Sequence, residues 1–158
     1  MIFYSFLSWY SQDILAVLSS DALLVPDILL LYVLYSNFSD FSRDSEKEVL
    51  LIWMLFFGGV LWDIRWIGIP GFFALVYTGT FLCASWTWSL FPESGHTGLV
   101  FFIILWISQF PSFFAGLYLW NIGTEYYLRS MLIFVAYSIP LSAIFSLLYV
   151  RKLKLTNV

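Results

Sequence analysis

The sequence is short of the residues on which most enzymes and metal proteins depend. It has one histidine and one cysteine in 158 residues, which excludes a disulfide framework and the usual cysteine–histidine metal sites. His96 follows Ser94 and Gly95, but the G-x-S-x-G turn of serine hydrolases is missing, and a histidine so close in sequence cannot act as their triad base. A glycine-rich phosphate loop is also missing. We therefore expect no enzyme activity, no metal and no cofactor.

Charge is scarce too. Charged residues make up 11% of the chain, the net charge is -3, and no block of like charge suggests nucleic acid. Hydrophobic residues make up 61%, against about 45–50% in soluble domains. A soluble chain of this length could not hide so much apolar surface. The aromatic share of 22% fits a protein that needs anchors at two membrane–water interfaces. The composition predicts an all-α integral membrane protein in contact with the lipid bilayer.

The apolar segments predict one polytopic membrane domain over residues 1–158, a compact bundle of five to six transmembrane helices, some short or kinked. The approximate spans are 1–20, 26–38, 49–63, 71–91, 98–120 and 131–150. The last three reach the length of about 20 residues that crosses the hydrocarbon core, whereas the second and third are short and flank one charged loop. Pro111 and Pro140 lie inside the last two spans and predict kinks there.

The first segment is the most polar of the six. It carries Ser5, Ser8, Ser11, Gln12 and Asp13, so it either spans the membrane or lies at the interface. It has no Lys or Arg before its apolar stretch and no small-x-small site after it, so we expect it not to be a cleaved signal.

Basic residues predict the orientation. Arg43 and Lys47 lie in the loop between the second and third spans, and three more basic residues follow the last span: Arg151, Lys152 and Lys154. The other side receives Arg65 and Arg129. Because Lys and Arg are enriched in cytoplasmic segments, we expect that loop and the C-terminus to be cytoplasmic.

Small and polar residues form two stripes inside the predicted spans. One consists of Ser108, Ser112 and Gly116, with Gln109 beside it near the middle of the fifth span, and the other of Ser138, Ser142 and Ser146. Small residues let transmembrane helices approach closely, so we expect the two stripes to pack together with Gln109 hydrogen-bonding across them. The alternative is a polar pocket for a ligand.

Asp63 lies at the C-terminal end of the third span, where the helix dipole disfavours a carboxylate. We expect either a counter-charge, Arg129 before Arg65, or a position in interfacial water from which Asp63 caps the next turn.

Two stretches resemble the MreD family of rod-shape-determining membrane proteins. The first is Val25-Pro26-Asp27-Ile28-Leu29-Leu30-Leu31-Tyr32-Val33-Leu34-Tyr35, which is similar to the family's Pro-Asp-(apolar)-Leu-Leu-Leu second span. The second is Gly59-Val60-Leu61-Trp62-Asp63, followed by Gly71 and by Ala74-Leu75. The basic residues after the last span also fit. The resemblance assigns local architecture or partner contact to Pro26, Asp27, Gly59, Asp63 and Gly71.

This resemblance implies a non-enzymatic subunit of the bacterial cell-elongation complex in the inner (cytoplasmic) membrane, which scaffolds or regulates peptidoglycan synthesis. Its partners would be other membrane proteins: an MreC-like bitopic protein, an MreB-like filament, and a peptidoglycan glycosyltransferase and transpeptidase. The chain departs from the family pattern at Arg65 and Trp66, where a small polar residue or glycine is frequent. The alternative function is the substrate-binding membrane subunit of a vitamin importer, which would need a convergent polar pocket.

Overall fold

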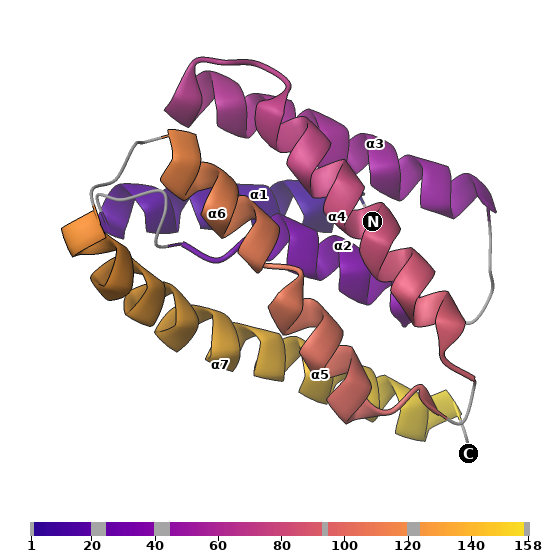
Figure 1. The fold of residues 1–158 in the computed structure, drawn as a ribbon. Coiled ribbons are helices and arrows are strands. Elements are labelled where there is room, and N and C mark those ends of the chain that lie inside the picture. The colour runs from indigo at the N-terminus through magenta and orange to yellow at the C-terminus, as the bar shows by residue number, and fades with distance from the viewer. Residues whose placement is uncertain (1, 20–24, 40–44, 93–94, 120–123, 157–158) are drawn as a thin grey trace.

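The computed structural model describes residues 2–19, 25–39, 45–92, 95–119 and 124–156, and these are almost entirely helical (Figure 1). The helices are α1 (Ile2–Ser19), α2 (Ile28–Phe38), α3 (Ser45–Trp62), the π-helical turn η2 (Asp63–Ile67), α4 (Phe72–Leu90), α5 (Gly98–Ile107), α6 (Phe110–Leu119) and α7 (Thr124–Thr156). No strand occurs in these described ranges, so the prediction of an all-α chain is confirmed. Arg43, used above for orientation, lies outside the described residues.

Helices occupy all six predicted segments, with changes at their ends. The third helix begins at Ser45, four residues before the predicted boundary at 49, so Lys47 belongs to α3 instead of a loop. The last helix, with 33 residues, extends past both of its predicted ends. Within the described residues, three stretches are long and apolar enough to cross a membrane: Ser45–Ile67, Gly98–Leu119 and Tyr126–Leu155. The first of these was expected to be short, and its early start and η2 supply the difference.

The fifth segment is broken where a kink was expected. It consists of α5 and α6, separated by Ser108 and Gln109. Pro111, the second residue of α6, has no N–H to donate, and in a continuous helix its ring would clash with the carbonyl of Ile107, where α5 ends. The proline therefore starts a new helix here. At Pro140, in contrast, α7 continues without a break.

Helix α2 lies at the centre of the bundle. It contacts α1, α3, α4 and α7, and six of its eleven residues are buried: Leu29, Leu30, Leu31, Val33, Leu34 and Phe38. Val25, Pro26 and Asp27 precede α2 without helical structure and are buried as well. Pro26 was expected in the first turn of the helix but lies two residues before its start. A short buried helix thus enters the bundle from a buried, non-helical stretch.

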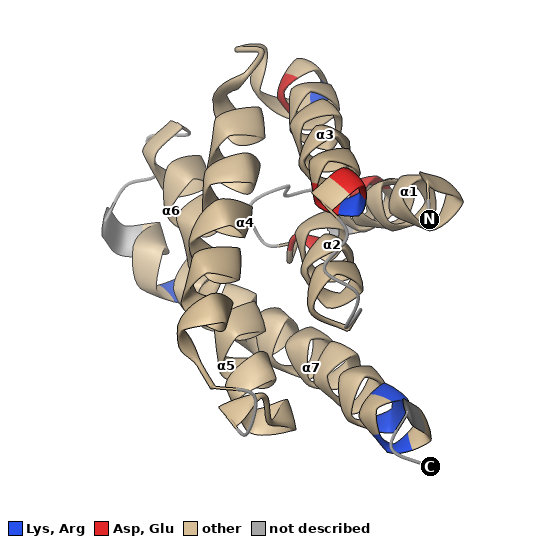
Figure 2. Ribbon diagram, turned by 90° about the vertical axis from the view of Figure 1, so that its right-hand side faces the viewer, with Lys and Arg blue, Asp and Glu red and all other residues tan. Residues whose placement is uncertain are grey.

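The ends of α2 and α7 meet at one end of the bundle. Lys152 of α7 donates to the Ser39 hydroxyl at 3.3 Å, and Ser39 directly follows α2. Basic residues gather at this C-terminal end of α7, and both signs of charge gather at the start of α3 (Figure 2). The start of α3, where Lys47 donates to the Ser36 carbonyl of α2 at 3.0 Å, and the C-terminal end of α7 therefore share one end of the bundle.

Candidate functional site

A buried polar centre lies where α2 begins. Asp27 is the N-cap residue of α2 and is 5% exposed, but its side chain makes no capping bond to its own helix. Its Oδ1 accepts hydrogen bonds from the Tyr77 hydroxyl of α4 at 2.6 Å and from Gln12 Nε2 of α1 at 3.3 Å. Its Oδ2 contacts the Ser112 hydroxyl of α6. The Asp27 backbone N–H donates to Gln109 Oε1 at 2.7 Å. These five residues, called the polar centre below, join α1, α2, α4 and the α5–α6 break.

The polar centre satisfies two buried backbone N–H groups at the start of α2. Gln12 Oε1 accepts the backbone N–H of Leu29 at 3.3 Å, and Gln109 accepts that of Asp27. Buried backbone groups without partners cost free energy, so these two glutamines stabilise the start of α2. The other polar atom of the Gln109 amide, Nε2, is buried and has no hydrogen-bond partner among the described residues.

Asp63 holds the first turn of α4. Its carboxylate accepts the backbone N–H groups of Gly71 at 2.9 Å and Phe73 at 3.0 Å, and it is fully buried. The N-terminal amides of a helix lack partners within the helix, and the positive end of its dipole stabilises a carboxylate there. The expectation of a counter-charge from Arg129 or Arg65 is therefore wrong, because backbone donors take that place. The expected capping role agrees with these bonds, whereas the expected position in interfacial water is wrong, because Asp63 is buried.

The glycines around Asp63 allow the tight turn from α3 to α4. Gly68 and Gly71 have φ values of 76° and 99°, in the left-handed region that glycine adopts without strain. A Cβ on Gly59 would lie 2.4 Å from the Ala74 Cα, so α3 and α4 touch backbone to backbone. Gly59, Asp63 and Gly71 thus belong to one structural unit, the α3–α4 hairpin.

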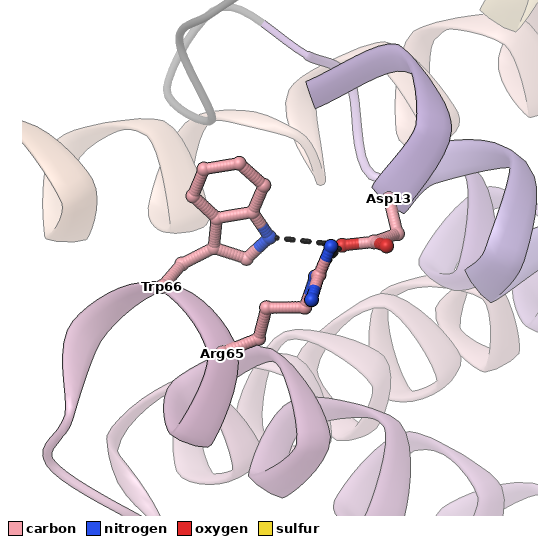
Figure 3. Close-up of polar contacts among 3 residues, drawn as sticks. All are labelled: Asp13, Arg65 and Trp66. Atoms are coloured by element: carbon pink, nitrogen blue, oxygen red, sulfur yellow. Dashed lines mark hydrogen bonds and ion pairs between the residues drawn. The ribbon is translucent and has the colours of Figure 1, made fainter. Parts of the chain in front are cut away.

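A third carboxylate, Asp13, fixes the C-terminal half of α1. Asp13 Oδ1 accepts from Arg65 Nε at 2.6 Å and from the Trp66 indole N–H at 3.1 Å (Figure 3). The Asp13 side chain is 10% exposed and that of Arg65 is 51% exposed. Arg65 and Trp66, where the chain departs from the MreD pattern, therefore bind α1 to η2.

The expectation that the two small-residue stripes pack against each other is wrong. On α7, Ser138 accepts from the Trp106 indole at 3.2 Å, and Ser146 donates to the Gly98 carbonyl at 2.7 Å, so this stripe faces α5. Ser142 is fully buried between them, and its hydroxyl has no partner in the part of the chain that the structure describes. The other stripe turns to α2, through the contact of Ser112 with Asp27. Gly116 is buried in α6, and Ser108 bonds back to the Leu105 carbonyl at 2.7 Å.

The reactive side chains singled out in the sequence lie apart from the polar centre. The His96 ring stacks on Trp88 with centroids 4.3 Å apart, and its Nε2 lies 3.3 Å from the Trp88 carbonyl. It is thus half-buried rather than a freely solvated loop residue. Cys83 is exposed. Within the described ranges, no three His, Cys, Asp or Glu side chains come together as a metal site would require.

Gln12 and Tyr77 were not predicted as members of the site. A signal for Gln12 existed: Ser5, Ser8 and Gln12 are spaced by three and four residues, which places them on one face of a helix. Tyr77 stands among apolar residues, and its role depends on a contact with Asp27, fifty positions away.

Comparison of the chain with known families, with curated proteins and with solved structures gives no match in any of the three.

Proposed function

We propose that the protein is a multi-pass membrane protein that works through lateral contacts with other membrane proteins, as a non-enzymatic subunit of the bacterial cell-elongation complex. The observation that supports the membrane setting best is the inverted polarity of α1. Its inward residues include Ser5, Ser8, Gln12 and Asp13, all at least nine-tenths buried. Its outward residues are apolar and exposed: Ile2, Phe3, Tyr4, Phe6, Leu7, Tyr10, Ile14, Leu15, Val17 and Leu18.

The same inversion extends over the bundle. Serines, glutamines and aspartates are buried on α1, α6 and α7, while leucines, isoleucines and aromatic residues are exposed on every helix from α3 to α7. A soluble protein rarely exposes such continuous apolar surface. In a bilayer the arrangement is favourable, because polar groups find partners inside the bundle and apolar side chains meet lipid.

The elongation role is supported by the residue pattern shared with the MreD family. Two parts of that pattern, around Asp27 and around Asp63, are places where a buried carboxylate organises the bundle. Asp27 and Asp63 face inward, so they would maintain the fold, and partners would bind the apolar outer faces. The same proposal puts the C-terminus of α7 in the cytoplasm, by the excess of basic residues at that end.

Membrane insertion is tested by extraction. Membranes from cells that express the chain are washed with alkaline carbonate and then dissolved in mild detergent. We expect the protein to stay in the membrane pellet after the wash and to dissolve only in detergent. Release by carbonate would contradict the proposal.

The elongation role is tested by affinity purification of the tagged chain from detergent-solubilised native membranes, followed by mass spectrometry of the bound proteins. We expect the MreC-like protein and the glycosyltransferase–transpeptidase pair to be enriched over a control purification with an unrelated multi-pass protein. An ATP-binding cassette with a bound vitamin would instead identify an importer subunit. The groove of about 200 Å³ between Phe3, Phe6, Leu7 and Tyr10 is apolar and lies on the outer face of α1, unlike the pocket an importer needs.

A further inference from the structure

The two oxygens of the Asp27 carboxyl have different surroundings. Oδ1 faces two side-chain donors, the Tyr77 hydroxyl and Gln12 Nε2. Oδ2 contacts the Ser112 hydroxyl. A hydroxyl, unlike an N–H group, can accept a hydrogen bond as well as donate one. The Tyr77 hydroxyl already accepts from Gln12 Nε2 at 3.2 Å, so its own hydrogen is left for Oδ1. Oδ2 is therefore the oxygen that can carry a proton.

The Ser112 hydroxyl has another acceptor within reach. It lies 2.9 Å from the Gln109 carbonyl, three residues earlier, an ordinary bond for a serine in the first turn of a helix. A hydroxyl has one hydrogen to donate. When that hydrogen goes to the Gln109 carbonyl, the contact between Ser112 and Asp27 needs a hydrogen from the carboxyl. With this one proton on Oδ2, both contacts of Ser112 become hydrogen bonds.

The charges around Asp27 point the same way. Its partners are a tyrosine, a glutamine and a serine, all neutral, and it is 5% exposed. Arg65, the basic residue of η2, is bound to Asp13. An ionised carboxylate buried among neutral groups is costly, and a proton removes the charge.

The remaining charged groups of the neighbouring elements are engaged elsewhere or lie toward the helix ends. The Asp63 carboxylate binds the first amides of α4. The basic residues of α7 lie toward its two ends, at Arg129 and at 151–154, while Ser142 and its neighbours form the middle of the helix. On α4 the titratable group that faces Asp27 is Tyr77, whose hydroxyl donates to it.

We propose that the polar centre is a proton-binding site. In this site Asp27 carries a proton at neutral pH and donates a hydrogen bond through it to the Ser112 hydroxyl. The site links four parts of the bundle, α1, α2, α4 and α6, through one removable proton. This proposal does not depend on the elongation role, since it concerns the interior of the bundle.

Asp63 provides an internal contrast. Both of its oxygens accept backbone N–H groups, which cannot accept a hydrogen bond in return. A proton has no acceptor there, so Asp63 is the carboxylate that stays ionised. Asparagine imitates a protonated aspartate, with an oxygen that accepts and an NH₂ that donates. It should therefore fit at position 27 and fail at position 63.

Infrared spectroscopy of the full chain in detergent at neutral pH tests the proposal. We expect the C=O stretch of a protonated carboxyl in the wild type, its loss in Asp27→Asn, and its retention in Asp13→Asn, the matched control. A wild type without this band, or a band that survives Asp27→Asn, would overturn the proposal.

Thermal unfolding and one further variant complete the test. Asp27→Asn should keep the melting temperature close to that of the wild type, whereas Asp63→Asn should lower it clearly. An equal loss in the two variants would show that Asp27 is held as an anion.

Ser112→Ala should shift the carboxyl band, because the carboxyl O–H loses its acceptor. That measurement decides the matter even when Asp27→Asn gives too little protein, since an unchanged band would refute the bond to Ser112.

Discussion

At the scale of single residues, Gly59 sets the distance between α3 and α4. The Ala74 backbone occupies the place of the missing side chain, and Asp63, one turn later, binds the amides of the same helix start. The close approach and the cap support each other, because a wider separation would draw the carboxylate away from its donors.

Gly59→Ala should therefore destabilise the protein by about 3 kcal/mol, because the new Cβ can be accommodated only if two backbones move apart. The control is Gly79→Ala in α4, where a Cβ meets nothing within 4 Å. Removing a glycine from a helix interior should there stabilise the protein by about 0.5–1 kcal/mol. Thermal unfolding in detergent measures both variants, and a loss of similar size in the two would show that the helices are not in contact at Gly59.

The ion pair between Asp13 and Arg65 is also a residue-scale feature, and we expect it to be weak. Arg65 is half exposed, and exposed pairs contribute at most about 1 kcal/mol. In a double-mutant cycle of Asp13→Ala and Arg65→Ala, the coupling free energy should therefore stay below about 1 kcal/mol. A coupling of several kcal/mol would mean that the pair is shielded from solvent.

At the scale of elements, the break between α5 and α6 is maintained by polar contacts as well as by Pro111. Gln109 accepts the N–H of Asp27 from within the break. Gln109→Leu should leave that buried N–H without a partner and cost about 1–3 kcal/mol. Ser108→Ala, the neighbouring control, removes only a bond from the serine to its own helix and should change the stability much less. If the two variants melt alike, the break does not depend on the polar centre.

The elements show how far the sequence can predict this protein. Apolar run length located all six helical segments, because run length and helix length have the same physical cause. It missed the break at Ser108–Gln109, since a proline in an apolar run indicates either a kink or a new helix. The spacing of small residues led us to pair the wrong stripes: the α7 serines face Trp106 and Gly98, and Ser112 faces Asp27. Helical spacing tells which residues share a face but not which helix that face meets.

At the scale of the whole molecule, the polar face of a helix could be predicted from the sequence, but the residues that bind its polar and charged side chains could not. The polar face of α1 could be read from residue spacing, yet Tyr77 and Arg65 become its neighbours only when helices distant in sequence are packed together. The same holds for Asp63, whose donors are backbone groups that no residue type reveals.

The topology is a prediction at this scale. Ser45 and Leu155 are exposed near the end of the bundle where Lys152 meets Ser39, and Ile69 is exposed in the turn beyond η2, at the other end of α3. In a Cys83→Ser background, a membrane-impermeant thiol reagent applied to intact cells should label a cysteine at 69 and miss cysteines at 45 and 155. Permeabilised cells provide the control, in which all three should react. Labelling of 45 or 155 in intact cells would contradict the orientation.

The inverted polarity of α1 also determines the order in which the protein can be assembled. The polar side chains of α1 find their partners on helices made later: Gln12 meets Tyr77, 65 residues further on, and Asp13 meets Arg65, 52 residues further on. An aspartate at the centre of an isolated helix opposes insertion by about 2.5–3.5 kcal/mol on the translocon scale. In the proposed membrane setting, α1 leaves the ribosome before it can be stable in lipid, and it has to wait at the translocon or at the bilayer surface until α4 has been synthesised. Biogenesis of this chain in that setting therefore depends on whatever shelters α1 until α4 has been made.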